Sequence, residues 1–73
     1  MIHEICKLHS RLGNDTELVI KMSRYDYECK IQKDDRILKV DDRTLKVVKP
    51  SGVISLINIT YVMVVYYHRR LYL

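Results

Sequence analysis

The chain has 73 residues, of which 48% are hydrophobic and 30% charged, and its formal net charge is +4. This composition is typical of a folded protein and excludes a disordered one, and the length predicts a single domain over residues 1–73. A chain of this size buries only about 60% of its unfolded surface, so we expect a homo-oligomer. The basic balance favours acidic partners such as nucleic acid.

Residues 2–12 are predicted to form a short helix. The apolar stripe of this helix, at steps of three and four, consists of Ile2, Ile5, Cys6, His9 and Leu12. Gly13-Asn14 supplies a C-terminal stop. The first residues, MIHEICKLHSR, contain neither an uninterrupted apolar run nor a small-residue cleavage site. We therefore expect no signal peptide.

From Thr16 onward the hydrophobic period changes to two, which predicts β-strands. The apolar residues of the first alternating run are Leu18, Ile20 and Met22, and those of the second are Tyr25, Tyr27, Cys29 and Ile31. The apolar face changes near Ser23-Arg24. Two interpretations stay open for this change, a tight turn or a β-bulge in one long bent strand.

The segment DDRILKVDDRTLKV, residues 34–47, repeats a seven-residue unit with Thr44 in place of Ile37. Paired Asp and β-branched residues disfavour a helical heptad. A metal or acid–base site is also disfavoured, because Asp35 and Asp41 would lie roughly 20 Å apart along an extended segment. We interpret each unit as a turn followed by a strand, which predicts a hairpin. Its two strands are Arg36–Val40 and Arg43–Lys49.

The last part of the chain predicts two more strands. Residues 50–52, PSG, predict a turn because Pro fixes one dihedral angle and Gly adopts a positive one. The strands are Val53–Ile57 and Tyr61–Arg69, with a brief turn or single helical turn between them. Residues 53–67 carry no charge, but they are fewer than the roughly 20 that a membrane-spanning helix needs. We therefore expect two buried strands and no membrane contact.

Metal binding and catalysis find little support in the sequence. His3, Cys6 and His9 are zinc-ligand types, but on a helix they climb about 9 Å and spread around the axis, and zinc needs four ligands at one point. There is no phosphate-binding loop and no nucleophile-elbow motif. We expect no metal, no cofactor and no enzymatic activity. The two cysteines predict reduced thiols in the cytoplasm, with a Cys6–Cys29 disulfide as the alternative.

The C-terminal run YYHRRLYL, residues 66–73, combines tyrosine rings with cations. Tyrosine can stack on bases, and arginine can bind phosphate through paired hydrogen bonds. Lysines along the polar sides of the middle strands extend this basic character. The predicted nucleic-acid-binding residues are Tyr66, Tyr67, His68, Arg69, Arg70, Lys39 and Lys46.

The stretch YVMVVYY, residues 61–67, predicts a different function. It is an uncharged, β-prone strand with apolar side chains on both faces. Such a strand at a sheet edge pairs with another chain, so a protein-interaction or regulatory module is the alternative to a nucleic-acid-binding one. The candidate interface residues are Tyr61, Val62, Val64 and Tyr66.

One short helix followed by about five antiparallel strands predicts a mostly β fold, a small bent barrel over roughly residues 16–70. This element order resembles that of the Sm-like RNA-binding proteins over most of the chain, and the resemblance implies an RNA-binding barrel. The glycine-bearing motif that this family carries around its last two strands has no counterpart here, since Gly13 and Gly52 fall in a cap and a turn. No functional residue is therefore carried over. A pleckstrin-like sheet is the second choice. It is less favoured than the barrel because no C-terminal helix follows the last strand.

Overall fold

The computed structural model describes residues 1–24 and 27–70. The predicted alternation through Tyr25 and the last residues of the run YYHRRLYL, including Tyr72, lie outside the described residues. The elements in chain order are α1 (Ile2–His9), β1 (Thr16–Met22), β2 (Glu28–Ile31), β3 (Arg36–Lys39), β4 (Thr44–Val48), β5 (Ile54–Asn58), the 3-10 helix η1 (Ile59–Tyr61) and β6 (Val62–Arg69). The mostly β prediction with one short helix is confirmed.

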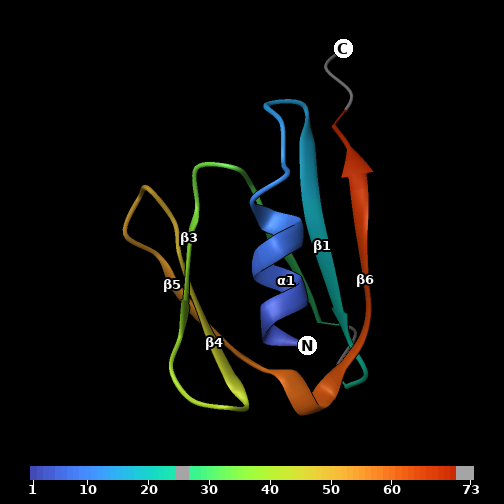
Figure 1. Cartoon of the computed structure of the whole chain (residues 1–73), viewed down its shortest axis with the longest axis vertical. Helices are drawn as coiled ribbons and strands as arrows, with labels where there is room; N and C mark the ends of the chain where they lie inside the picture. Colours follow the sequence, from blue (N-terminus) through green and yellow to red (C-terminus); the bar gives the residue numbers. More distant parts are fainter. Residues whose placement is uncertain (25–26, 71–73) are drawn as a thin grey trace.

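The strands form two three-stranded antiparallel sheets (Figure 1). Sheet A has the order β2-β1-β6, and sheet B has the order β3-β4-β5. The last strand therefore returns to pair with the first, with Ile20 opposite Val65. The chain moves from sheet A to sheet B at the polar turn between β2 and β3, where the Gln32 N–H donates to the Asp35 carboxylate at 2.8 Å.

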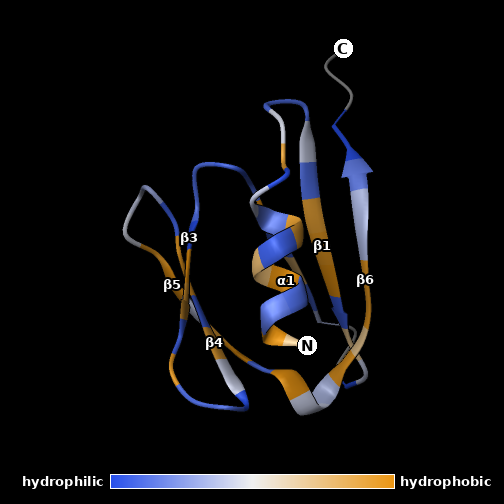
Figure 2. Cartoon of the chain, in the orientation of Figure 1, coloured by the Kyte–Doolittle hydropathy of each residue, from blue (hydrophilic) through white to orange (hydrophobic). Residues whose placement is uncertain are grey.

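The core lies where α1 and the two sheets meet. Ile5 of α1, Leu18 and Ile20 of β1, and Leu45 and Ile57 of sheet B are each 1% exposed or less and belong to one cluster. Burying one such side chain stabilises the fold by about 1.5–3 kcal/mol. Figure 2 shows the hydrophobic stretches along the strands, whereas the β2–β3 and β3–β4 connections are largely hydrophilic.

The local turns follow the side chains that the sequence supplies. The predicted hairpin is confirmed as β3–β4, and its turn begins where the Arg43 N–H donates to the Asp41 carboxylate at 2.8 Å. That hydrogen bond, with another from Thr44, lowers the pKa of Asp41. The PSG turn is confirmed as well, because Gly52 has φ +93° and its N–H donates to the Lys49 carbonyl at 2.9 Å.

Several element boundaries differ from the predicted ones by one to three residues. The helix ends at His9 instead of residue 12, and Leu12 follows it in a turn while staying buried. The change of face near Ser23-Arg24 is a chain reversal, since the Met22 N–H donates to the Tyr27 carbonyl at 2.9 Å and β2 pairs antiparallel with β1. A register shift also lies between Lys21 and Met22 against β6. In the described part of the chain, no helix has the length and apolarity needed to cross a membrane.

Candidate functional site

The predicted nucleic-acid-binding residues of β6 lie on both faces of sheet A. Tyr67 is opposite the buried Leu18, and its hydroxyl donates a hydrogen bond to the Leu8 carbonyl of α1 at 3.0 Å. It therefore lies on the core side of the sheet. Tyr66 and His68, the residues on either side of it, point to the outer face because side chains alternate along a strand. One ligand surface thus contains Tyr66 and His68 but not Tyr67.

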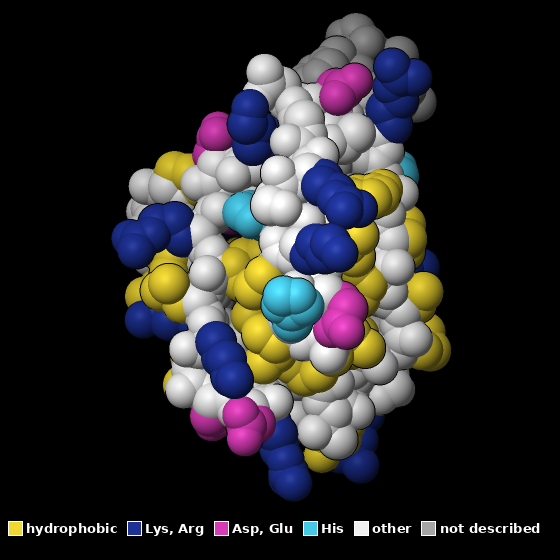
Figure 3. All heavy atoms as spheres, in the orientation of Figure 1, with side chains coloured by type: hydrophobic (Ala, Val, Ile, Leu, Met, Phe, Trp, Pro, Cys, Tyr) yellow, Lys and Arg dark blue, Asp and Glu magenta, His cyan; other side chains and the backbone are white. Residues whose placement is uncertain are grey.

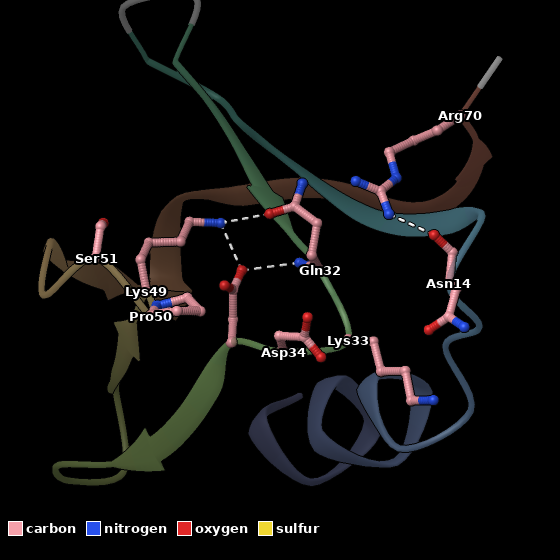
Figure 4. Close-up of a pocket in the computed structure, with 9 residues that line it drawn as sticks. Asn14, Gln32, Lys33, Asp34, Lys49, Pro50, Ser51 and Arg70 are labelled. Atoms are coloured by element: carbon pink, nitrogen blue, oxygen red, sulfur yellow. Dashed lines mark hydrogen bonds and ion pairs between the residues drawn. The ribbon is translucent and has the colours of Figure 1, made fainter. Parts of the chain in front are cut away.

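The two arginines after His68 contact the loop that precedes β1. The Nε of Arg69 lies 3.6 Å from Oδ2 of Asp15 in an exposed ion pair. The backbone N–H of Arg70 donates to the Asp15 carbonyl at 2.7 Å, and its guanidinium donates to the Asn14 carbonyl (Figure 4). Both arginines thus hold the C-terminal end of β6 against this loop.

The two predicted lysines lie on sheet B and on opposite faces of it. Lys39 is opposite the buried Leu45, and its Nζ lies 3.3 Å from Oδ1 of Asp42. Lys46 is opposite the exposed Leu38 on the outer face. Figure 3 shows the same dispersal from the side of α1, where Lys and Arg side chains are spread over the surface instead of gathered into one patch.

The structure instead places two other cations beside tyrosine rings. The Nζ of Lys21 lies 5.8 Å from the centre of the Tyr66 ring, and the guanidinium carbon of Arg24 lies 4.8 Å from the centre of the Tyr61 ring. Such cation–π contacts stabilise exposed sites by about 0.5–1 kcal/mol. Neither Lys21 nor Arg24 is predicted from the sequence, because their contacts with the rings depend on the pairing of β1 with β6. The alternation of β1 was the only sequence signal for Lys21.

A network of polar side chains crosses the outer side of sheet A to the β2–β3 turn. Glu17 is nearly fully buried, and its carboxylate accepts a hydrogen bond from Gln32 Nε2 at 2.9 Å and lies 3.1 Å from His68 Nδ1. Burial raises the pKa of Glu17, and the hydrogen bonds with Gln32 and His68 lower it by more. The ionised carboxylate is therefore the form that the fold stabilises.

Lys49 completes this network from the end of β4 (Figure 4). Its Nζ lies 2.5 Å from Oδ2 of Asp35, 2.8 Å from Oε1 of Gln32 and 2.7 Å from the carbonyl of Lys30. An ammonium group has three N–H donors, so these contacts use all of them. The neighbouring pocket of about 400 Å³ thus has a lysine that is committed to the fold and not to a ligand.

The Glu17 carboxylate predicts a pH dependence of stability. Since its pKa in the folded protein lies below the ordinary value of 4.5, its contribution is present above pH 4.5 and is lost as the pH falls through the folded pKa. We expect Glu17→Gln to be less stable than the wild type at pH 7, and the difference to shrink below pH 4.5. Urea unfolding at both pH values measures it. A difference that is the same at both pH values would contradict the assignment, and Glu28→Gln serves as an exposed control.

The candidate interface residues are only partly exposed. Tyr61 and Val62 are half-buried, and Val62 packs against the core cluster, whereas Val64 and Tyr66 are exposed. In the described chain, β6 pairs with β1 along one edge and with no strand along the other. A single free edge with exposed apolar side chains is therefore available on β6.

The prediction that residues 53–67 form two buried strands is wrong for both, since β5 has one buried residue and β6 has none. Ile57 is buried, but Val53 and Ile54 are exposed and Leu56 is 66% exposed. The register places Leu56 opposite Lys46 on the outer face of sheet B. No other described strand or helix covers that face, so only alternate positions of the strand enter the core.

Metal-binding and nucleophilic groups stay dispersed in the described residues. No group of three or more His, Cys, Asp or Glu side chains converges there, and the ring of His9 contacts the Gln32 carbonyl at 3.1 Å. Cys6 and Cys29 are both free thiols. Burial raises the pKa of Cys29, which disfavours its reactive thiolate.

Comparisons with models of known protein families, with curated protein sequences and with solved structures found no match. The best-defined candidate ligand surface is the outer face of sheet A, where a tyrosine ring, a histidine and a lysine lie side by side.

Proposed function

We propose that this chain is a small non-enzymatic binding module that contacts single-stranded nucleic acid through the outer face of sheet A. The observation that carries the proposal is the exposed Tyr66 ring with the Lys21 Nζ at 5.8 Å. A ring offers a stacking platform for a base, and a neighbouring cation attracts the phosphate backbone. Single-stranded RNA and DNA both present these groups.

The proposed surface, called the tyrosine face below, consists of Tyr66, His68, Lys21 and Lys30. Val19 of β1 lies between members of this face, because it is opposite Tyr66 of β6 on one side and Lys30 of β2 on the other. The Nζ of Lys30 lies 3.8 Å from Glu28, an exposed contact that costs little to break. The tyrosine face thus keeps two of the residues predicted from the sequence and adds two lysines.

The order of the elements supports a related proposal about the fold. We infer that the two sheets, joined by the turn between β2 and β3, together form a small barrel like that of the Sm-like RNA-binding proteins. The adjacency of the first and last strands in one sheet supports this inference. The free thiols of Cys6 and Cys29 fit a reducing compartment, and we propose the cytoplasm.

Tyr66→Leu is expected to weaken the binding of a short fluorescein-labelled single strand by about tenfold, because base stacking on an aromatic ring contributes about 1–3 kcal/mol. Fluorescence anisotropy measures the Kd. We also expect binding to weaken steeply between about 50 and 200 mM salt, because phosphate contacts release counterions. Tyr67→Leu is the matched control, since it removes the same ring from the opposite face. Equal losses in both variants, or no binding at low salt, would sink the proposal.

The free edge of β6 favours a second candidate, a module that docks on a protein or on its own copies by strand pairing. Met63 and Val64 are exposed along this edge strand, and main-chain groups of an edge can pair with an added strand. Size-exclusion chromatography with light scattering, run on the anisotropy samples, separates the two candidates. An oligomer that is indifferent to salt and does not bind oligonucleotide would favour strand pairing.

A further inference from the structure

A small apolar pocket opens at one end of sheet A, where the chain leaves β1 and enters β2. Its volume is about 200 Å³, and its lining residues are Met22, Arg24, Tyr27 and Tyr61. Backbone hydrogen bonds set the two tyrosines at the end of β1. The Met22 N–H donates to the Tyr27 carbonyl at 2.9 Å, and the Ser23 N–H donates to the Tyr61 carbonyl at 2.7 Å.

This pocket adjoins a second hollow that is lined by a residue of the tyrosine face. A neighbouring hollow of about 280 Å³ shares Met22 and Tyr27 with the pocket and is also lined by Lys21. Lys21 is the same residue whose Nζ lies 5.8 Å from the Tyr66 ring. A path of alternating rings and cations thus runs from Tyr66 past Lys21 to the pocket. Val62, at the pocket end of β6, lies four residues from Tyr66, roughly 13 Å along the strand.

We propose that the pocket holds one unstacked nucleobase of the single strand bound on the tyrosine face, an inference that rests on the proposed function. The rings of Tyr27 and Tyr61 line a space whose surface is almost wholly apolar, which suits the faces of a planar ring. The Arg24 guanidinium, 4.8 Å from the Tyr61 ring, puts a cation beside it for the phosphate.

The cations beside the apolar lining favour this occupant over an aliphatic side chain of a partner protein. The described lining residues of the pocket include the cation Arg24, and in the adjoining hollow Lys21 is opposite Glu28. A nucleotide supplies both a flat apolar face for the tyrosines and an anion for Arg24 and Lys21. An aliphatic side chain would fill the pocket but would leave both cations without a new partner.

Photocrosslinking tests the proposal on the wild-type protein. A short single strand that carries 4-thiouracil bases is irradiated on the folded protein, and mass spectrometry identifies the modified residues. We expect crosslinks at Tyr27 or Tyr61 in addition to Tyr66. Crosslinks at Tyr66 without any in the pocket would overturn the base pocket and leave the proposed function standing. A strand that neither binds nor crosslinks would overturn both.

A substitution gives an independent readout. Tyr27→Leu is expected to raise the Kd for the same strand about tenfold, the loss of one stacked base, and to abolish pocket crosslinks while those at Tyr66 persist. Tyr27 is exposed, so the fold should tolerate the change, and circular dichroism checks it. An unchanged Kd and an unchanged crosslink pattern would overturn the assignment. Tyr67→Leu on the opposite face is again the matched control.

Discussion

Lys49→Met is expected to lower the free energy of unfolding by about 3 kcal/mol at neutral pH, because it leaves a buried carboxylate without its cation. The Asp35 side chain is 2% exposed, and its Oδ2 lies 2.5 Å from the Lys49 Nζ. The Gln32 N–H, which also donates to Asp35 at 2.8 Å, stays in the variant. That donor satisfies one hydrogen bond but does not neutralise the charge. Met has a similar length and volume, so little of the effect comes from packing.

The lysine also connects the two sheets. From the end of β4 in sheet B, its Nζ donates to the Lys30 carbonyl of β2 in sheet A at 2.7 Å and to the Gln32 amide oxygen at 2.8 Å. Since Gln32 in turn donates to Glu17, the substitution removes the common donor of a network that spans both sheets. Hydrogen bonds to charged groups contribute about 1.5–3 kcal/mol each, more than neutral ones.

Guanidinium unfolding followed by circular dichroism measures the change. Lys39→Met is the matched control, because the Lys39 and Asp42 side chains are 58% and 95% exposed in a pair 3.3 Å apart. An exposed pair contributes about 0–1 kcal/mol, so this control should be nearly neutral. Asp35→Asn in the Lys49→Met background should recover part of the loss, because it removes the unpaired charge. A Lys49→Met loss no larger than that of Lys39→Met would show that the buried pair is not stabilising.

Much of the secondary structure follows from local chemistry. The step of three and four near Ile5 predicts the helix, the alternation around Ile20 predicts β1, and the PSG turn at Gly52 is confirmed by its positive φ. The pairing of the strands does not follow from local chemistry. The neighbours of β1 are β2 and β6, and a strand more than forty positions away in the sequence leaves no local pattern of that contact.

In the candidate site, too, local pattern predicts side-chain orientation but not the contacts between paired strands. The opposite orientations of Tyr66 and Tyr67 follow from strand alternation alone, so adjacent residues of the run could never share a face. The contact of Lys21 with the Tyr66 ring depends on the β1–β6 register, which the sequence does not specify. The burial of Asp35 could not be predicted from the sequence either, because aspartate is usually exposed and the partner lysine lies fourteen positions away.

The seven-residue repeat shows how identical sequence leads to different environments. Leu38 and Leu45 hold the same place in the units DDRILKV and DDRTLKV. Residues opposite one another in a hairpin share a face and side chains alternate along each strand, so the β3–β4 register decides which faces the equivalent residues of the two units occupy. Leu38 is opposite Lys46, the neighbour of Leu45 in β4, so Leu38 and Leu45 lie on opposite faces of the hairpin. Leu38 is 41% exposed, whereas Leu45 is 0% exposed.

Leu45→Ala is accordingly expected to lower the free energy of unfolding by about 3 kcal/mol, through lost apolar burial and the cavity left among packed neighbours. Leu38→Ala, the same substitution in the other unit, should cost less than about 1 kcal/mol, because its side chain already contacts water. Urea unfolding of both variants measures the difference. A small domain has a total stability of about 5 kcal/mol at the low end, so Leu45→Ala should also show a markedly lower midpoint. Equal losses at the two positions, or a larger loss at Leu38, would contradict this assignment of the two faces.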